Sequence, residues 1–344
     1  MSKKFLIIGP TGQIGWFFAD FLLKNTNLIV FGSSRKGENL FNVERFIPLK
    51  IDLSDKNSII NAITYCKPDY IVNCAAFTHP ANSWECPERT IELNSISIIH
   101  ILEAIRNIVP KCRFVNIGSI LELGTKLNLN VGQTPYAISK ITSQNIINCY
   151  RNKYDLFAIQ PLASQTESYR RDQFFATRKI SKGIASIVSA LKLNKSFFSI
   201  NLGNIDAPIH FIHSLDVVEA IWTILNQDCI YAPDCQYIIC NEETHTLREF
   251  VQIGFKMAGI DGIWINKKSL KISEQNKDTD VFRIKQELVD YPLLVERNEE
   301  LFRKNDHDII NLDSTNIKNL GWKPKYSFED IVKEMINYDL QNQL

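Results

Sequence analysis

A tyrosine and a lysine four positions apart carry the clearest chemistry in this sequence. Tyr136 and Lys140 lie in a stretch whose apolar spacing predicts a helix, so their side chains would share one helix face. Tyrosine has an ordinary pKa of about 10, and a neighbouring ammonium group favours its phenolate form. The pair therefore predicts a general base that takes a proton from a hydroxyl group.

A serine precedes this pair along the chain. Ser119 follows the apolar run Arg113–Ile117, which predicts a strand. Its hydroxyl would hydrogen-bond the same oxygen and steady a carbonyl group as it forms. A Tyr-x-x-x-Lys pair alone has little specificity. Its position after a glycine-rich turn, four strands and a strand-end serine favours a catalytic set of Ser119, Tyr136 and Lys140.

The elements that must position these residues alternate between strands and helices. Continuous apolar runs predict strands, and apolar residues at i, i+3 and i+4 predict helices. This alternation predicts an α/β fold with a Rossmann-type doubly wound parallel sheet, covered by helices on both faces. We expect strands at Lys4–Ile8, Leu28–Phe31, Phe46–Ile51, Tyr70–Ala75, Arg113–Ile117 and Leu156–Gln160, and helices at Gln13–Lys24, Asn57–Cys66, Ile91–Ile108 and Tyr136–Lys153.

A glycine-rich turn joins the first predicted strand to the first predicted helix. Three glycines lie within seven positions there, although the chain has only 14 glycines in 344 residues. In a dinucleotide-binding fold such glycines allow a tight turn, a close approach of the backbone to the pyrophosphate, and packing of the helix on the strand. The expected contacts are Gly9, Thr11, Gly12, Gln13, Ile14 and Gly15.

The end of the second strand is where such a fold distinguishes NAD from NADP. A carboxylate there would bind the ribose 2′-hydroxyl of NAD, but the sequence after Phe31 is Gly-Ser-Ser-Arg-Lys. Hydroxyl groups and cations suit a 2′-phosphate, so NADP is favoured over NAD. We expect contacts from Ser34, Arg35, Lys36, Tyr136, Lys140, Asp52, Leu53 and Ala75. The last three of these residues are equally consistent with packing at strand ends.

The second half of the chain has a less regular pattern. We expect an NADP-binding Rossmann domain over 1–160 and a smaller C-terminal α/β domain for the substrate over 161–344. Segments near 196–226 and 236–241 are expected to return to the Rossmann body. The elements expected here are helices at Thr177–Leu193, Leu215–Asn226, Leu247–Ala258 and Phe328–Leu340, a strand near Ser196–Leu202, and a loop at Ile265–Asp280.

The composition argues against several classes of protein. With 39 basic and 38 acidic residues, bulk charge gives no support to nucleic-acid or membrane-surface binding. No stretch is long and apolar enough for a membrane span, and the N-terminal apolar run is too short for a signal peptide. The eight cysteines show no spacing typical of a metal site. We expect a cytoplasmic protein with buried free thiols and no metal.

Several motifs point to one family. Residues 167–171 have the sequence E-S-Y-R-R, and residues 175–180 have the sequence F-A-T-R-K-I. Together with the glycine turn and the Ser, Tyr and Lys set, they resemble the extended short-chain dehydrogenase/reductase family, and within it the GDP-mannose 4,6-dehydratases. The resemblance covers nearly the whole chain. Further matches are Gly203–Ala207, His213, Asp216–Ala220 and Gly321–Pro324.

The resemblance implies a substrate and a reaction. The substrate would be a GDP-linked hexose or a related nucleotide sugar, oxidised at C4 by bound NADP, dehydrated across C5 and C6, and then given the hydride back. It also implies a homodimer or homotetramer. Cations in the matching region suit a diphosphate, although each taken alone is more typical of a solvated surface charge, and only the shared motif favours binding. The implied substrate contacts are Gln165, Thr177, Arg178, Lys179 and Arg303.

The sequence departs from the family on the substrate side. The family has a glutamate two positions after its strand-end Ser or Thr, where this chain has Leu121, and the carboxylate is Glu122. In extended backbone, a slip of one residue turns a side chain to the opposite face unless a bulge restores it. Glu122 is the fourth catalytic candidate on this basis. Ile209 also replaces a family arginine, and the segment between Ser119 and Tyr136 is shorter than in the family.

These departures leave alternatives open. Val30–Asp52, Ile117–Ser119 and Glu122 are also similar to GDP-4-keto-6-deoxymannose reductases, which need only the Ser, Tyr and Lys set. A GDP-sugar C4 reductase, dehydrogenase or epimerase that does not dehydrate is therefore compatible with the sequence. A catalytically idle nucleotide-sugar-binding subunit is a further alternative, although such a subunit would not need Tyr136 and Lys140.

Overall fold

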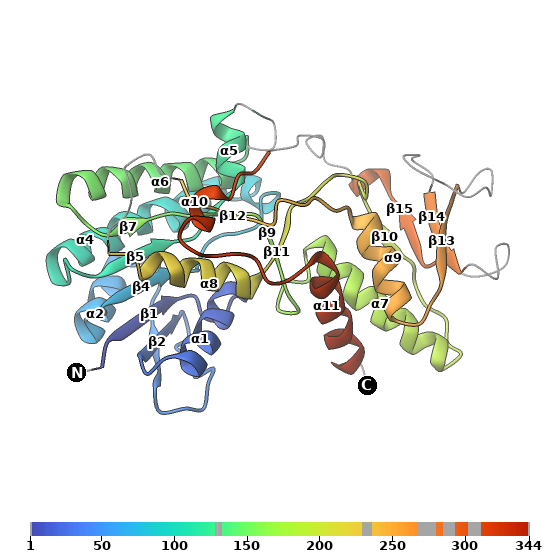
Figure 1. Cartoon of the computed structure of the whole chain (residues 1–344), viewed down its shortest axis with the longest axis horizontal. Helices are drawn as coiled ribbons and strands as arrows, with labels where there is room; N and C mark the ends of the chain where they lie inside the picture. Colours follow the sequence, from blue (N-terminus) through green and yellow to red (C-terminus); the bar gives the residue numbers. More distant parts are fainter. Residues whose placement is uncertain are drawn as a thin grey trace. The chain divides into compact units, whose positions relative to one another are not determined.

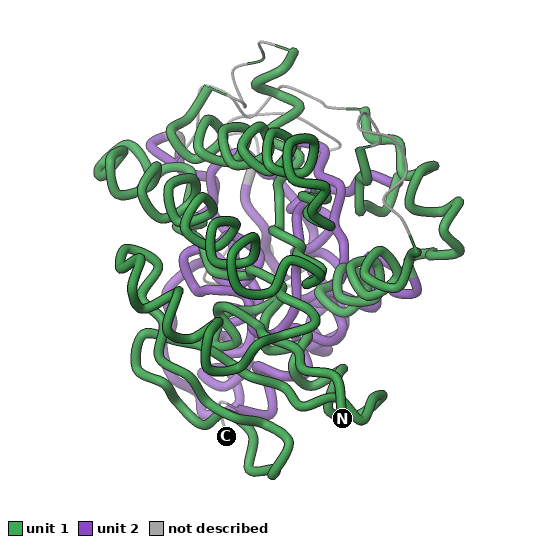
Figure 2. Tube along the Cα trace, turned by 90° about the vertical axis from the view of Figure 1, so that its left-hand side faces the viewer, with its two compact units in different colours: residues 1–164, 214–242, 310–324 green, residues 165–213, 243–309, 325–344 purple. Residues whose placement is uncertain are grey.

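The chain folds into two compact units, which Figure 2 colours separately. The computed structural model describes residues 2–127, 129, 133–228, 236–266, 280–284, 293–301 and 311–342. Unit 1 comprises Met1–Ser164, Ser214–Glu242 and Ile310–Pro324, and unit 2 comprises Gln165–His213, Glu243–Ile309 and Lys325–Leu344.

Unit 1 is built on a six-stranded sheet in which every neighbouring pair of strands is parallel. The strand order β3-β2-β1-β4-β5-β7 has its topological reversal between β1 and β4, the crevice where doubly wound sheets bind ligands. The predicted α/β fold is confirmed. The strands are β1 (Lys4–Ile8), β2 (Ile29–Ser34), β3 (Phe46–Lys50), β4 (Tyr70–Asn73), β5 (Arg113–Asn116) and β7 (Ala158–Ile159).

Helices cover both faces of this sheet (Figure 1). Side chains of β1 alternate between the two faces: the Phe5 ring lies 5.2 Å from that of Phe18 in α1 and 6.3 Å from that of Trp222 in α8. Leu6 and Ile8 instead join the core formed with α2, α4 and α6. Burial on both faces explains why the strands are continuously apolar. The helices are α1 (Gln13–Asn25), α2 (Lys56–Cys66), α4 (Ser97–Ile108), α6 (Pro135–Tyr154) and α8 (Ser214–Leu225).

The helix expected over Ile91–Ile108 is not continuous. It consists of α3 (Pro87–Ile91), a π-helical turn at Glu92–Ile96, and α4. The buried Asn94 at the centre of the π-helical turn accepts a hydrogen bond from the backbone N–H of Phe77 (2.8 Å) and donates one to Ser139 Oγ (2.9 Å). The wider turn thus lets a side chain tie the segment after β4 to α6.

A second, small parallel sheet in unit 1 carries the strand-end serine. It has the order β12-β8-β6, with β6 at Gly118–Ser119, β8 at Leu162–Ala163 and β12 at Ile238–Ile239. Ser119 pairs with Ala163 in this sheet. Two short helices complete the unit, α5 (Leu121–Lys126) and α10 (Thr315–Lys318).

Unit 2 combines helices with a mixed sheet of order β10-β15-β14-β13, and its apolar core lies between them. The loop expected at Ile265–Asp280 is wrong at both ends, because the buried Ile265 belongs to β13 (Gly262–Asn266) and Asp280 begins β14 (Asp280–Ile284). Residues 267–279 lie outside the described part of the chain. The strands are β9 (Gln165–Glu167), β10 (Ile200–Leu202), β11 (Phe211–His213), β13 (Gly262–Asn266), β14 (Asp280–Ile284) and β15 (Val295–Arg297), and the helices are α7 (Ala176–Lys192), α9 (Leu247–Met257) and α11 (Phe328–Asn342).

The two units differ from the expected division of the chain over 196–213. Those residues fall in unit 2, where β10 pairs with β15 and β11 pairs with β9. Residues 214–226 and 236–241 fall in unit 1. A further unit 1 segment, Ile310–Pro324, had no counterpart in the sequence prediction. The functions expected of the two units stay predictions.

Among the described residues, every helix is too short or too polar to cross a lipid bilayer.

Candidate active site

The glycine turn of unit 1 has the geometry of a phosphate cradle. Gly9 has a φ of +86° and its N–H donates to the backbone oxygen of Ser33 (2.9 Å). A Cβ atom on Gly15 would lie 2.2 Å from the Gly9 oxygen, so only glycine allows the helix to pack this closely. Gly12 is the N-cap of α1 and brings no capping side chain. The positive end of the helix dipole is therefore available to a bound anion.

The second strand ends three residues later than expected, at Ser34 instead of Phe31. Ser33 is buried within it, and the exposed Arg35 and Lys36 follow. Ser34 Oγ donates a hydrogen bond to Glu38 Oε2 (2.6 Å). The sequence interpretation missed this carboxylate, which lies four residues beyond the end of β2. Its distance from the glycine motif, close to the typical spacing of about 20 residues, was the available signal.

The other three expected cofactor contacts lie at strand ends. Asp52 Oδ1 accepts hydrogen bonds from the backbone N–H (3.0 Å) and hydroxyl (2.7 Å) of Ser54, which hold the pKa of its carboxyl below the ordinary value. Leu53 packs into the core. The backbone and Cβ of Ala75 lie against Gly9, with 2.9 Å between the Ala75 Cβ and a Cβ built on that glycine. Asp52 and Leu53 thus have structural roles here, and their contact with a cofactor stays a prediction.

The predicted Tyr–Lys pair lies in the first turns of α6. Lys140 Nζ is 6.0 Å from the centre of the Tyr136 ring and donates to the backbone oxygen of Ile117 (2.7 Å). Tyr136 is 9% exposed and its backbone N–H donates to Ser83 Oγ (3.2 Å). Burial lowers the pKa of Lys140 to about 8, with the charge of Glu122 acting in the opposite direction. The lysine thus titrates close to neutral pH, as acid–base groups in enzymes do.

Glu122 does not lie in extended backbone, so the expected face reversal after Ser119 is wrong. The chain turns directly into α5, and the Glu122 side chain is fully buried, at 0% exposure. Its Oε1 accepts hydrogen bonds from the Ser119 N–H (2.8 Å) and Gln160 Nε2 (2.9 Å). Burial raises the pKa of this carboxyl to about 7, although the Ser119 hydrogen bond and the Lys140 charge act in the opposite direction.

In unit 2, two of the expected substrate contacts bind one buried glutamate. Gln165 Nε2 donates to Glu167 Oε1 and Thr177 Oγ1 donates to Glu167 Oε2, each over 2.8 Å. Burial raises the pKa of the Glu167 carboxyl. These contacts hold β9 to the start of α7, and the predicted substrate roles of Gln165 and Thr177 stay predictions.

The expected cations of unit 2 have partners within the protein. Arg178 is buried, forms an ion pair with Asp339 of α11 and lies 5.5 Å from the centre of the Tyr338 ring. Lys179 is exposed, and its Nζ donates to the backbone oxygen of Asn201 (2.6 Å). Arg178 therefore has a clear structural role between two helices, whereas Lys179 keeps access to solvent. Arg303 lies outside the described residues.

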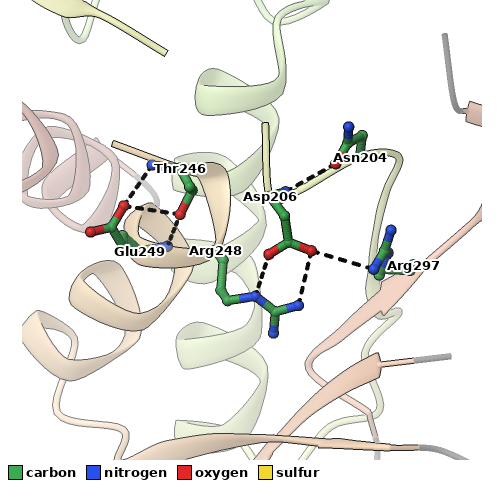
Figure 3. A network of polar contacts seen from close by, with 6 residues as sticks. All are labelled: Asn204, Asp206, Thr246, Arg248, Glu249 and Arg297. Carbon is green, nitrogen blue, oxygen red and sulfur yellow. Dashed lines mark hydrogen bonds and ion pairs between the residues drawn. The ribbon is translucent and has the colours of Figure 1, made fainter. Parts of the chain in front are cut away.

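A further charged cluster in unit 2 was missed by the sequence interpretation (Figure 3). Asp206 accepts hydrogen bonds from Arg248 Nε (2.5 Å) and Nη2 (3.1 Å) and from Arg297 Nη1 (3.4 Å). The Arg248 guanidinium also lies 4.6 Å from the centre of the Trp264 ring. Asp206 belongs to the matched motif Gly203–Ala207, but its two partners come from distant positions that no local pattern connects. The described residues contain no cluster able to hold a metal ion.

Comparison with known proteins decides the family. The sequence profile described as GDP-mannose 4,6 dehydratase matches residues 6–335. The chain belongs to that family. GDP-mannose 4,6 dehydratase 1 of Arabidopsis thaliana is 31% identical, covering 98% of this chain and 90% of its own length. GDP-mannose 4,6-dehydratase of Yersinia enterocolitica is 30% identical, covering 98% and 94%.

Solved structures agree with this GDP-mannose 4,6-dehydratase family assignment at the level of the fold. UDP-glucose 4-epimerase of Thermotoga maritima gives a TM-score of 0.76 at 17% identity, covering 99% of this chain and 100% of its own. A dTDP-glucose 4,6-dehydratase of Bacillus anthracis gives 0.71 at 18% identity, covering 99% and 98%. The resemblance that the sequence predicted is confirmed, and the chain is an enzyme of the nucleotide-sugar dehydratase type.

Proposed function

We propose that this enzyme converts a GDP-linked hexose, with GDP-mannose the first choice, by redox chemistry at C4 and loss of water across C5 and C6. The observation that carries the proposal is the buried Lys140, anchored on Ile117 beneath the Tyr136 ring, in a chain of the GDP-mannose 4,6-dehydratase family. The named relatives act on GDP-mannose by their own descriptions. The substrate of this chain follows from them by analogy.

The chain's own residues would move the C4 hydroxyl proton. With Lys140 protonated, the Tyr136 phenolate is favoured and accepts that proton while a carbonyl forms at C4. Ser119, held in β6, would donate a hydrogen bond to the same oxygen. A nicotinamide cofactor held by the glycine turn of unit 1 would supply the oxidising and reducing power for hydride exchange at the sugar.

The residues of the glycine turn fit such a cofactor. Gly9, Gly12 and Gly15 leave a cradle that a Cβ would fill, at the start of a helix without a capping side chain. Arg35 and Lys36 are exposed just beyond β2 and suit a 2′-phosphate, so NADP is the proposed cofactor. The negative charge of the Glu38 carboxylate would repel that phosphate. The balance between this carboxylate and the two cations would set the preference for NADP over NAD.

Mass spectrometry tests the reaction. Purified protein is incubated with GDP-mannose and a small amount of NADP. The proposal predicts a product lighter by one water molecule and no net NADPH. Stoichiometric NADPH without loss of water would show a simple C4 dehydrogenase, the reading that Leu121 favours because it stands where the family has a glutamate. If neither GDP-mannose nor GDP-4-keto-6-deoxymannose reacts, the substrate assignment falls.

The proposed assembly is a homodimer or homotetramer acting in the cytoplasm. The location rests on cysteine spacing that favours free thiols in a reducing compartment, and the assembly rests on the family resemblance. Sedimentation of the purified protein tests it, and a species of only 39.5 kDa would contradict it.

A further inference from the structure

We infer that Glu122 is a positioning residue, a buried counter-charge that holds Lys140 and the backbone of Ser119 in place, and is not the acid–base group of the elimination. The inference rests on the proposed function of the same site. It assigns to this side chain a role that differs from the catalytic one expected from the sequence.

The hydrogen bonds of Glu122 point inward. Its Oε1 lies 2.8 Å from the Ser119 N–H and 2.9 Å from Gln160 Nε2. Its Oε2 is buried and makes no hydrogen bond to any described residue. A Cβ on Gly118 would lie 2.7 Å from Oε1, so the glycine leaves the space that the carboxylate occupies. With 0% exposure, the carboxylate cannot touch a sugar bound at the surface of unit 1.

Gln160 connects this carboxylate to the catalytic helix. Its Nε2 also donates to the backbone oxygen of Lys140 (2.9 Å), and its Oε1 accepts from Asn116 Nδ2 (2.5 Å) and Ser143 Oγ (2.8 Å). One amide therefore joins α5, the end of β5 and α6 within unit 1. This connection links the Glu122 carboxylate to the backbone of Lys140 and so gives it a route to position the lysine.

The charges around the lysine explain why the carboxylate matters. Lys140 is 5% exposed, and an ammonium group buried to this degree needs an opposite charge. The groups that favour its charged form are Glu122 from α5 and Cys74 from the segment after β4, with Glu122 the stronger. Burial raises the pKa of the Cys74 thiol, so the thiol stays neutral near pH 7. Lys126 is a further cation that acts on Glu122, and Tyr136 faces the lysine from its own helix.

Direct titration of Lys140 tests the inference without turnover. Protein labelled with carbon-13 at the lysine ε-carbon is titrated by NMR, and Lys140 is identified by its loss in Lys140→Arg. Its signal should change near pH 8, well below exposed lysines. In Glu122→Gln the negative charge is gone, so we expect the midpoint to fall by about one pH unit. Glu85→Gln, at an exposed site of the same unit, should leave it unchanged.

The pH profile of activity separates positioning from acid–base catalysis. Under the inference, Glu122→Gln shifts the alkaline limb of kcat to lower pH, because Lys140 loses its proton earlier, and slows C4 oxidation and dehydration together. An acid–base role of Glu122 in the elimination would instead abolish dehydration while C4 oxidation continued at the wild-type rate. An unchanged Lys140 midpoint overturns the inference even if the enzyme dehydrates GDP-mannose. If Glu122→Gln shifts the Lys140 midpoint but the wild-type protein does not act on GDP-mannose, the inference is supported and only the proposed substrate is contradicted.

Discussion

Two buried charged clusters described above, one in each unit, are built differently. In unit 2, Asp206 receives hydrogen bonds directly from Arg248 and Arg297. In unit 1, Glu122 and Lys140 form no direct ion pair, and the Gln160 amide and nearby backbone groups stand between them.

The difference has a consequence for protonation. Guanidinium groups stay charged at any pH that a protein tolerates, and both cations of the unit 2 cluster are guanidinium groups. The carboxyl and ammonium groups of unit 1 are buried without direct pairing, and their pKa values converge toward neutrality, to about 7 and about 8. Direct pairing thus suits a structural cluster, whereas the indirectly coupled groups of unit 1 have pKa values that each depend on the charge of the other.

The largest expected effect belongs to Tyr136. Tyr136→Phe removes the proposed base, so we expect kcat to fall by about a thousandfold or more, the upper range for general base catalysis. The melting temperature should change little. Tyr154→Phe, on the same helix but 42% exposed, serves as the matched control and should keep full activity. Equal activity of Tyr136→Phe and wild type would contradict the role of Tyr136 as the base in unit 1.

Next in size is the loss of the direct cluster in unit 2. Asp206→Ala leaves the mostly buried Arg248 and Arg297 without their carboxylate, and we expect a loss of about 3 kcal/mol in the free energy of unfolding. Urea denaturation measures it, with the exposed Glu300→Ala as control. The Lys140 titration should not move. A shift of the Lys140 midpoint in Asp206→Ala would contradict the distinction between a structural cluster in unit 2 and a titrating cluster in unit 1.

Removal of the bridging amide should have an intermediate effect. Gln160→Leu leaves the buried partners of the amide unsatisfied, at a cost of about 2 kcal/mol in unfolding free energy. Without the Nε2 donor the anionic form of Glu122 is less stable, so the pKa of Lys140 should fall, by less than in Glu122→Gln. A Lys140 midpoint identical to wild type would mean that the carboxylate acts without the bridge.

The placement of Tyr136 and Lys140 on one helix face and the glycine turn could be predicted because local rules determine both. Glycine spacing at a strand–helix junction sets the turn at Gly9–Gly15, and helix periodicity alone brings Tyr136 and Lys140 to one face. Helix α5 could not be predicted, since six residues are too few to show a period.

The environment of Glu122 depends on Gln160, which is 38 positions away, and Arg178 meets Asp339 across 161 positions. Contacts of that range follow from tertiary packing and leave no local pattern in the sequence. The end of β2 was predicted too early for a related reason. Ser33 belongs to the strand because its backbone pairs with β1 and β3, and a polar side chain gives no apolar signal for this pairing.

The smallest expected effect concerns the cofactor. Glu38→Gln removes the carboxylate bonded to Ser34 and with it the repulsion of a 2′-phosphate. We expect the ratio of NADPH to NADH affinity to rise about fivefold, equivalent to about 1 kcal/mol. Fluorescence titration of the two reduced cofactors measures this ratio, with the exposed Glu44→Gln as control. An unchanged ratio would show that Glu38 does not face the ribose.

The central claim is that this enzyme oxidises its substrate at C4 and dehydrates it in one catalytic cycle. The most direct measurement uses GDP-mannose carrying deuterium at C4, unlabelled NADP in small amount, and NMR of the product. We expect a 4-keto-6-deoxy sugar with the deuterium transferred to C6. Deuterium collected on the cofactor with no loss of water, or retained at C4 of unchanged substrate, would contradict it.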